Sequence, residues 1–237
     1  MDQADSIVIL TGAGISKESG LATFRDRDGI WARHRIEDVA TPQAFQSNPE
    51  RVHSFYNARR AGLYEPSIAP NPAHDALVDL EKRWEGDFLL VTQNVDNLHQ
   101  RAGSQSLIAM HGSLSDARCV LCNYVTPWRE NLDTETECPN CGKTGGMRPD
   151  VVWFGEMPRE MDQIIERLES TALFIAIGTS ATVYPAAGFV EIAGRAGAMT
   201  IEANLEASQA SDLFDETILG PAAQTTPELV DRLLNPS

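Results

Sequence analysis

The sequence predicts an α/β protein whose parallel sheet has helices on both faces and is interrupted by a small inserted module. Short apolar runs rich in β-branched residues alternate with amphipathic segments of helical length, the pattern of parallel strands joined by crossover helices. The alternation stops between residues 113 and 148, where all four cysteines lie. A chain of 237 residues is long enough for one large domain that carries such an insertion.

The first predicted strand begins at Ser6 and leads directly into a glycine-rich turn, Gly12-Ala13-Gly14-Ile15-Ser16. Glycine admits positive φ and lets an anion approach main-chain N–H groups, and a following helix adds partial positive charge. The turn therefore predicts a dinucleotide phosphate site, although Lys17 replaces the third glycine of the usual fingerprint. The Lys17 side chain could point to solvent or reach an anionic group. A tight strand-to-helix turn that binds nothing is the alternative.

The later elements follow in chain order. Residues 22–29 are polar and glycine-punctuated and predict a loop, and Thr41-Pro42 opens a largely helical region in which Pro49 starts a helix. The next predicted elements are a helix over 72–84, strands over 88–92 and 106–110, the cysteine module over 113–148, a helix over 158–170, a strand over 173–177, a helix over 185–195 and a strand from 198 that ends at Asn204.

Small or polar residues follow the carboxyl ends of several predicted strands. They are Gly12, then Gln93, Asn94 and Asp96, then Gly178, Thr179 and Ser180, and finally Asn204. Ligands of open α/β sheets bind at this edge, so the coincidence favours a nucleotide site. Each cluster taken alone also fits an ordinary turn.

The cysteines form two C-x2-C pairs with none left over, namely Cys119, Cys122, Cys138 and Cys141. This spacing is typical of a structural zinc site, in which four thiolates leave no open coordination position. Two disulfides are the alternative, and a reducing cytoplasm disfavours them.

Composition limits the class of partner. The formal net charge of −15 argues against nucleic acid or an anionic membrane as the main partner. The start of the chain lacks the basic and apolar regions of a signal peptide, and no apolar run reaches the roughly 18–20 residues of a membrane span. We therefore expect a cytoplasmic protein, and we take it to be a monomer.

In their order and spacing, these motifs resemble the sirtuin family. The match comprises the glycine turn with Glu18-Ser19-Gly20 after it, Phe24-Arg25, residues 93–96, His111-Gly112, the cysteine pairs, residues 152–156 and residues 178–180. The chain is most similar to the short bacterial sirtuins that remove acidic acyl groups, the branch shared with the mitochondrial desuccinylase.

The resemblance implies NAD-dependent deacylation of acyl-lysine in proteins by a single catalytic domain. Its Rossmann-like part would comprise residues 1–30, 72–112 and 150–237. Its small zinc-binding and helical subdomain would come from two insertions, a helical one at 31–71 and a zinc-binding one at 113–149. The cofactors implied are NAD, as co-substrate, and one structural zinc ion.

The resemblance also implies roles for residues around NAD. The expected cofactor-binding residues are Gly12, Ala13, Gly14, Ile15, Ser16, Phe24, Arg25, Gln93, Asn94, Asp96, Gly178, Thr179, Ser180, Asn204, Leu205, Glu206 and Ala222. The acyl oxygen would attack C1′ of the nicotinamide ribose, nicotinamide would leave, and the products would include O-acyl-ADP-ribose.

A base must then take a proton from the ribose hydroxyls. His111 is the expected base, because an imidazole is substantially neutral at cytoplasmic pH and can accept that proton. Asn94 and Asp96 join it as catalytic residues. His99 is the nearest rival.

Acyl specificity is expected at Tyr56 and Arg59, which lie three residues apart and so share one face of a helix. A guanidinium and a phenol together suit a lysine adduct that ends in a carboxylate, such as succinyl or malonyl. Ala40 matches the small residue that widens this pocket in that branch. An amphipathic helix with a core tyrosine and a solvated arginine is the alternative.

The protein substrate is expected to lie extended against the segment 152–156 as an added strand, so the substrate-binding residues include Val152, Phe154, Gly155 and Glu156. Main-chain hydrogen bonds would contribute most of the binding affinity, so selectivity for the substrate sequence would be low. A buried turn between the zinc module and the sheet is the alternative.

Two rival classes share parts of this pattern. A zinc ribbon that binds nucleic acid needs a basic surface, whereas residues 129–141 hold Glu130, Asp133, Glu135 and Glu137 against Arg129. An NAD-dependent ADP-ribosyltransferase shares the site and the first chemical step. Release of nicotinamide without acyl transfer would distinguish it.

Overall fold

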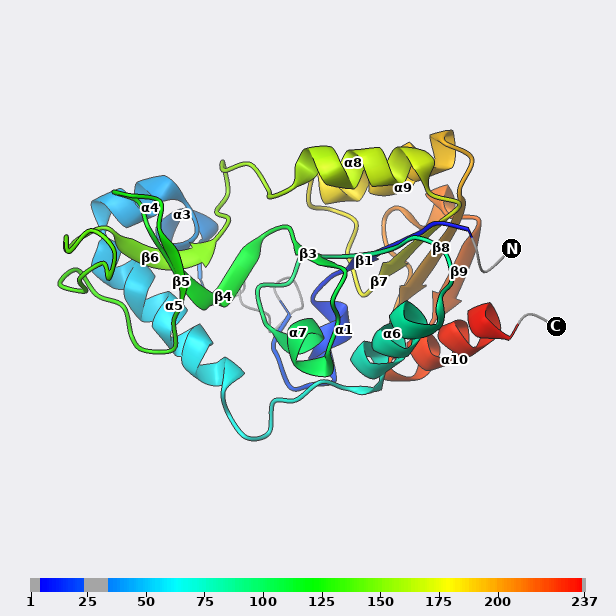
Figure 1. Ribbon diagram of the computed structural model, residues 1–237, viewed down its shortest axis with the longest axis horizontal. Helices are drawn as coiled ribbons and strands as arrows, with labels where there is room; N and C mark the ends of the chain where they lie inside the picture. The colour runs from blue at the N-terminus through cyan, green and yellow to red at the C-terminus, as the bar shows by residue number, and fades with distance from the viewer. Residues whose placement is uncertain (1–4, 24–33, 236–237) are drawn as a thin grey trace.

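The computed structural model describes residues 5–23 and 34–235, which form two sheets and the helices around them (Figure 1). Phe24 and Arg25, two of the residues expected to bind NAD, lie outside the described residues. Within the part described, none of the helices is long and apolar enough to cross a lipid bilayer.

The larger sheet has six parallel strands in the order β3-β2-β1-β7-β8-β9. The strands are β1 (Ile7–Thr11), β2 (Phe88–Thr92), β3 (Leu107–Ala109), β7 (Leu173–Ile177), β8 (Met199–Asn204) and β9 (Glu216–Leu219). The order runs outward in opposite directions from β1 and β7, so the point between these two strands is a topological switch point. Ligands of open parallel sheets bind beside such a point, at the carboxyl ends of the strands.

Strand β1 is buried along its whole length, and all its residues before Thr11 are apolar because both faces of the strand are covered. Ile7 and Ile9 join a core cluster with helices α6 (Pro72–Arg83) and α10 (Ala222–Leu234). Val8 and Leu10 join a second cluster with α8 (Met161–Ser170) and α9 (Phe189–Arg195). Figure 1 shows these two helix pairs on opposite faces of the sheet, so the expected fold class is confirmed.

The smaller sheet is antiparallel, with the order β5-β4-β6. Its strands are β4 (Gly112–Cys119), β5 (Val125–Pro127) and β6 (Met147–Val151). Helices α3 (Ile36–Val39), α4 (Pro42–Ser47) and α5 (Pro49–Leu63) lie beside it, toward the left of Figure 1. A core cluster that includes Phe55, Tyr56, Leu114 and Trp153 joins the helices to this sheet.

Local sequence sets the starts of the helices. The Asn48 side chain accepts a hydrogen bond from the main-chain N–H of Arg51, and Pro49 follows it as the first residue of α5. Asn71 caps α6 in the same way, and its cap is completed by His74. The predicted starts at Pro42, Pro49 and Pro72 are therefore confirmed.

Several predicted boundaries differ from the structure; the helix predicted over 185–195, for example, is a 3-10 turn over Ala186–Gly188 followed by α9 from Phe189. Helix α8 begins at Met161 rather than at residue 158, because Glu160 has φ +51° and a left-handed residue cannot continue a right-handed helix. Beyond Asn204 the sequence predicted no element, whereas the structure has β9 and α10 there. Two short helices, α1 (Gly14–Lys17) and α7 (Leu98–Ala102), follow the ends of β1 and β2.

Candidate active site

A cleft of 1710 Å³ lies at the carboxyl ends of β1, β2, β7 and β8 and extends to the small sheet. A second cavity of 660 Å³ adjoins it and shares Ala13, Phe55, Arg59 and Asn94 with it. Together they are lined by every described residue that the sequence predicted for NAD or substrate, with the single exception of Ile15. Ile15 instead packs in the core under the sheet.

Three glycines bring the turn after β1 against the end of β7. The main-chain N–H of Gly14 donates to the Gly178 oxygen at 2.8 Å, and a Cβ on Gly14 would lie 2.6 Å from the Gly178 Cα. A Cβ on Gly12 would lie 2.7 Å from the Gly178 oxygen. Gly178 has φ +62°, which favours glycine. These glycines are therefore needed for a close approach between two segments of the protein itself.

Asn94, Asp96 and Ser16 form one hydrogen-bonded group beside this turn. The Asn94 amide donates to the Gly12 carbonyl and to the Ser16 hydroxyl, at 3.1 Å each. Ser16 in turn donates to the Asp96 carboxylate at 3.0 Å. Burial raises the pKa of Asp96, and the hydrogen bonds from Leu98 and Ser16 and the charge of Arg59 oppose this shift.

A second polar group spans the next strand ends. The Gln93 amide donates to the Thr179 hydroxyl at 2.9 Å, and Asn204 donates to the Thr179 carbonyl at 2.9 Å. Ser180, Leu205, Glu206 and Ala222 line the same end of the cleft. The polar residues that the sequence placed at separate strand ends therefore meet at one edge of the sheet.

His111 lines the cleft just before β4, and its Nδ1 lies 3.0 Å from the Gln93 carbonyl oxygen. A carbonyl oxygen only accepts, so Nδ1 carries the proton and Nε2 presents a lone pair. Burial lowers the pKa of His111, although the bond to Gln93 opposes the shift. The ring is therefore neutral at neutral pH and can accept a proton at Nε2.

His99, the rival base, lies beneath the sheet edge and lines neither cavity. Its Nε2 bonds the Thr11 hydroxyl at 2.9 Å, and its ring packs 4.8 Å from that of His74. Burial and the neighbouring His74 lower the pKa of His99 to about 3. His99 therefore holds elements together and cannot reach a molecule in the cleft.

Tyr56 and Arg59 both line the cleft from α5, as their spacing predicts. Tyr56 is buried and its phenolic oxygen accepts a hydrogen bond from Trp153 Nε1 at 3.0 Å. Burial raises the pKa of Tyr56 to about 12, so the phenol keeps its proton. The Arg59 guanidinium lies 5.6 Å from the centre of the Phe55 ring.

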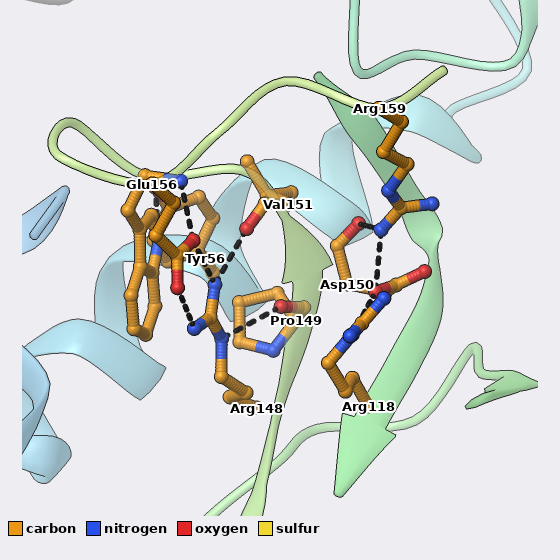
Figure 2. A network of polar contacts seen from close by, with 9 residues as sticks. Tyr56, Arg118, Arg148, Pro149, Asp150, Val151, Glu156 and Arg159 are labelled. Carbon is orange, nitrogen blue, oxygen red and sulfur yellow. Dashed lines mark hydrogen bonds and ion pairs between the residues drawn. The ribbon is translucent and has the colours of Figure 1, made fainter. Parts of the chain in front are cut away.

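The segment after β6 is a turn that an ion pair between Glu156 and Arg148 stabilises. The Glu156 carboxylate binds both terminal nitrogens of Arg148, at 2.7 and 2.9 Å, and accepts the main-chain N–H of Trp153 (Figure 2). The N–H of Glu156 closes the turn on the Trp153 carbonyl. Glu156 therefore supports this segment from within, and its N–H is not available to a substrate strand. Gly155, with φ +92°, is exposed at the tip.

The cysteine cluster fits a zinc ion. Cys119 ends β4, Cys122 lies in the next turn, and Cys138 and Cys141 lie between β5 and β6. The Sγ atoms of Cys119 and Cys141 are 3.9 Å apart, and those of Cys122 and Cys138 are 3.7 Å apart. A tetrahedral cage with Zn–S bonds of about 2.3 Å holds its sulfurs about 3.8 Å apart, whereas a disulfide holds them at about 2.05 Å. The thiols are free and spaced for a metal.

Sequence reasoning missed Arg148 and Trp153 as supports of the site, and it also missed Asp150. Asp150 is a buried residue of β6, and its carboxylate pairs with Arg118 at 2.8 Å and with Arg159 at 2.5 Å (Figure 2). No spacing rule links residues that meet only through the folding of two strands, so the sequence carried no signal for these pairs.

A parallel sheet with a polar cleft at its switch point defines a dinucleotide-binding α/β protein. The model of the Sir2 family matches residues 12–185. The chain belongs to the Sir2, or sirtuin, family, and it is an NAD-dependent protein deacylase.

Curated relatives support this assignment over the whole chain. An NAD-dependent protein deacylase of Bdellovibrio bacteriovorus is 57% identical over 97% of this chain and 97% of its own. Another of Salmonella typhimurium is 53% identical over 96% of this chain and 84% of its own.

Solved Sir2 structures superpose closely. A Sir2 homologue bound to NAD has a TM-score of 0.87 and is 39% identical, over 97% of this chain and 91% of that one. A mutant homologue bound to 2′-O-acetyl ADP ribose has a TM-score of 0.86 and 39% identity, over 96% and 91%. A Sir2 protein with a deacetylated p53 peptide and 3′-O-acetyl ADP ribose has a TM-score of 0.83 and 28% identity, over 96% and 92%.

Proposed function

We propose that this deacylase removes succinyl and malonyl groups, as well as acetyl groups, from lysine side chains in extended protein segments. The observation that carries the proposal is the placement of Tyr56 and Arg59 on one face of α5, lining the same cleft as His111. A buried neutral phenol donates one hydrogen bond, and a guanidinium donates two parallel ones to a carboxylate. An acyl group that ends in a carboxylate matches this donor set.

We propose that NAD occupies the edge of the sheet between the turn after β1 and Asn204. The turn 12–16, apart from the core residue Ile15, would face the phosphates. Phe24 and Arg25, which lie outside the described residues, stay predicted NAD-binding residues. Gln93, Asn94 and Asp96 would surround the nicotinamide ribose. The adenosine end would contact Ser180, Asn204, Leu205, Glu206 and Ala222. The NAD and acetyl ADP ribose complexes of Sir2 relatives support this arrangement.

When bound, NAD would supply an electrophilic ribose C1′, with nicotinamide as the leaving group, for the acyl oxygen of the substrate. His111 Nε2 then accepts a proton from a ribose hydroxyl, which frees that hydroxyl to attack the acyl carbon. Asn94 and Asp96 hold the polar side of the pocket. With one water consumed when the lysine amine leaves, the products would be nicotinamide, O-acyl-ADP-ribose and the free lysine.

We also propose that the substrate chain lies along the exposed side of Val152, Phe154 and Gly155. Phe154 is half-exposed, and nothing lies within 4 Å of a Cβ built on Gly155, so a peptide can approach there. The Sir2 relative solved with a p53 peptide supports a peptide substrate. Contacts that are mainly to main chain imply loose sequence selectivity.

The test is Arg59→Met. A charge-assisted hydrogen bond contributes roughly 1.5–3 kcal/mol, so desuccinylation should fall about ten- to a hundredfold. Deacetylation should change little, because an acetyl group offers no carboxylate. The measurement is the initial rate on acetyl-, succinyl- and malonyl-lysine peptides of one sequence, with and without NAD, followed by mass spectrometry.

Arg83→Met is the matched control, because Arg83 lies on the surface of α6 and pairs only with Asp79 among the described residues. This variant should leave all three rates unchanged. Equal losses on acetyl and succinyl peptides in Arg59→Met would refute the acidic-acyl proposal while leaving NAD-dependent deacylation intact.

A further inference from the structure

The acyl-binding face of α5 is tied to the turn after β6 by one side chain, Trp153. Its indole Nε1–H donates to the phenolic oxygen of Tyr56 at 3.0 Å, and the two rings lie 6.2 Å apart. Both residues are buried. Tyr56 lies on α5 and Trp153 in the turn after β6, so this bond joins two elements that both line the cleft.

The polarity of this bond is unambiguous. An indole nitrogen can only donate, so the phenolic oxygen of Tyr56 must accept. The phenol keeps its own proton because burial raises its pKa to about 12. The Tyr56 O–H is then left to donate elsewhere, and a hydroxyl that already accepts one hydrogen bond becomes a stronger donor.

Trp153 is itself held on three sides. Its main-chain N–H donates to Glu156 at 2.8 Å, and the Arg148 guanidinium stacks 3.4 Å from its ring centre. The Phe45 ring packs 5.4 Å from it on another side.

The supports of Trp153 are fixed in turn. Arg148 binds both carboxylate oxygens of Glu156 and donates to the Val151 carbonyl at 2.6 Å (Figure 2). Hydrogen bonds from Arg148 and Trp153 lower the pKa of Glu156 against the opposing effect of burial, so the pair stays charged. These contacts together support the orientation in which the indole N–H donates to Tyr56.

We propose that Trp153 is a positioning residue for acyl specificity: its indole N–H occupies the Tyr56 oxygen and commits the Tyr56 O–H to donate to the carboxylate of an acidic acyl group. This inference rests on the proposed acidic-acyl activity. Without the indole N–H, the phenol is free to turn and to accept as well as donate, which weakens its grip on a carboxylate. An acetyl group makes no use of this bond.

The experiment is Trp153→Phe, which keeps an aromatic ring under Arg148 and removes the N–H. A neutral hydrogen bond contributes about 1 kcal/mol, so kcat/KM for succinyl peptide should fall about fivefold, through KM. The rate on acetyl peptide should stay within about twofold. Trp84→Phe is the matched control, since the Trp84 indole also donates one hydrogen bond, to the Asp5 carbonyl at 2.8 Å, on a core face away from the cleft.

A double-mutant cycle supplies the decisive readout. If Trp153 acts through the Tyr56 hydroxyl, Trp153→Phe combined with Tyr56→Phe should lose no more desuccinylation than Tyr56→Phe alone. Additive losses, or equal losses on both acyl groups, would overturn the inference.

Two further arms keep the outcomes distinct. If Arg59→Met and Tyr56→Phe lose no more desuccinylation than deacetylation, the proposed function fails. If those two variants lose mainly desuccinylation and Trp153→Phe does not, only this inference fails. Should Trp153→Phe fold poorly, 3-benzothienylalanine at position 153 replaces the N–H by sulfur in the same ring shape and should give the same split.

Discussion

At the residue scale, one hydrogen bond decides which nitrogen of His111 is reactive. The Gln93 carbonyl accepts the Nδ1–H of His111, which leaves the lone pair of Nε2 for the proton transfer that we propose. The sequence selected His111 from five histidines through a family motif. It had no means of ranking His111 against His99 by environment, because burial and partners depend on where the strands place each ring.

The state of His111 predicts a pH profile. The neutral ring is the active form, and burial lowers its pKa below the ordinary value of 6.5. Activity should therefore persist below pH 6.5 and fall only at lower pH. The measurement is kcat/KM for acetyl peptide between pH 5 and 8. His111→Ala should reduce turnover by about 10²–10⁴-fold across this range.

The His111→Ala protein should keep the wild-type melting temperature and bind NAD, which separates catalysis from folding. An acid limb centred above pH 6.5, or near-normal turnover by the folded variant, would contradict the assignment.

At the scale of elements, the contact between α1 and the end of β7 explains the unusual glycine spacing. Lys17 replaces the third glycine of the common fingerprint, while Gly178 supplies the close approach from another strand. The sequence of the turn after β1 therefore contains only two of the three glycines that pack closely here. Its partner lies far away in the sequence, next to β1 only because the sheet places β7 there.

Gly178→Ala should therefore destabilise the protein. The new Cβ would lie 2.4 Å from the Ile15 nitrogen at a residue with φ +62°. Overpacking and left-handed strain each cost about 1–3 kcal/mol, so the free energy of unfolding should fall by at least about 2 kcal/mol. Urea unfolding followed by circular dichroism measures this change.

Gly194→Ala is the matched control. Gly194 lies in α9, and nothing is within 4 Å of a Cβ built there. This substitution should raise the free energy of unfolding by about 0.4–1 kcal/mol. Equal effects of the two substitutions would show that the contact between Gly178 and α1 is not tight.

At the scale of the whole molecule, two buried histidines make stability depend on pH. His74 completes the cap of α6 and packs against His99 from α7, beneath the sheet edge that carries the cleft. Burial lowers the pKa of His74 to about 4 and, with the neighbouring His74, that of His99 to about 3. Both rings are neutral in the folded protein, whereas in the unfolded chain they take up protons near pH 6.5.

Stability should consequently fall as the pH drops below 6.5, because the unfolded state then binds more protons than the folded state. Each histidine contributes a slope of about 1.4 kcal/mol per pH unit, until about pH 4 for His74 and about pH 3 for His99. Urea unfolding at pH 7.5, 6.0 and 5.0 measures the decline. His74→Gln keeps an acceptor for the cap. The slope of the unfolding free energy against pH should be smaller in this variant by the contribution of one titrating histidine. An unchanged slope in that variant would rule out His74 as a source.

The sequence by itself determined what depends on neighbouring residues. The predicted strands β2 and β7 match the structure residue for residue, because apolar runs of five residues bounded by turn residues are too short for a typical buried helix and fit a buried strand. The helix starts at Pro49 and Pro72 follow from Asn-Pro pairs, and the cysteine spacing brings the four thiols together at metal-binding distance. The polar residues at the strand ends predicted the edge where the cleft lies.

Only the tertiary structure decided which residues meet across long stretches of chain. The bond from Trp153 to Tyr56, the pairing of Asp150 with two arginines and the contact of Gly178 with α1 all join segments brought together by sheet order. After the last predicted strand, β9 completes the far edge of the sheet and α10 packs with α6 on one of its faces. Local periodicity reflects backbone sterics within a few residues, whereas these contacts depend on how distant layers pack. The sequence therefore specified the chemistry of the site, and packing specified its geometry.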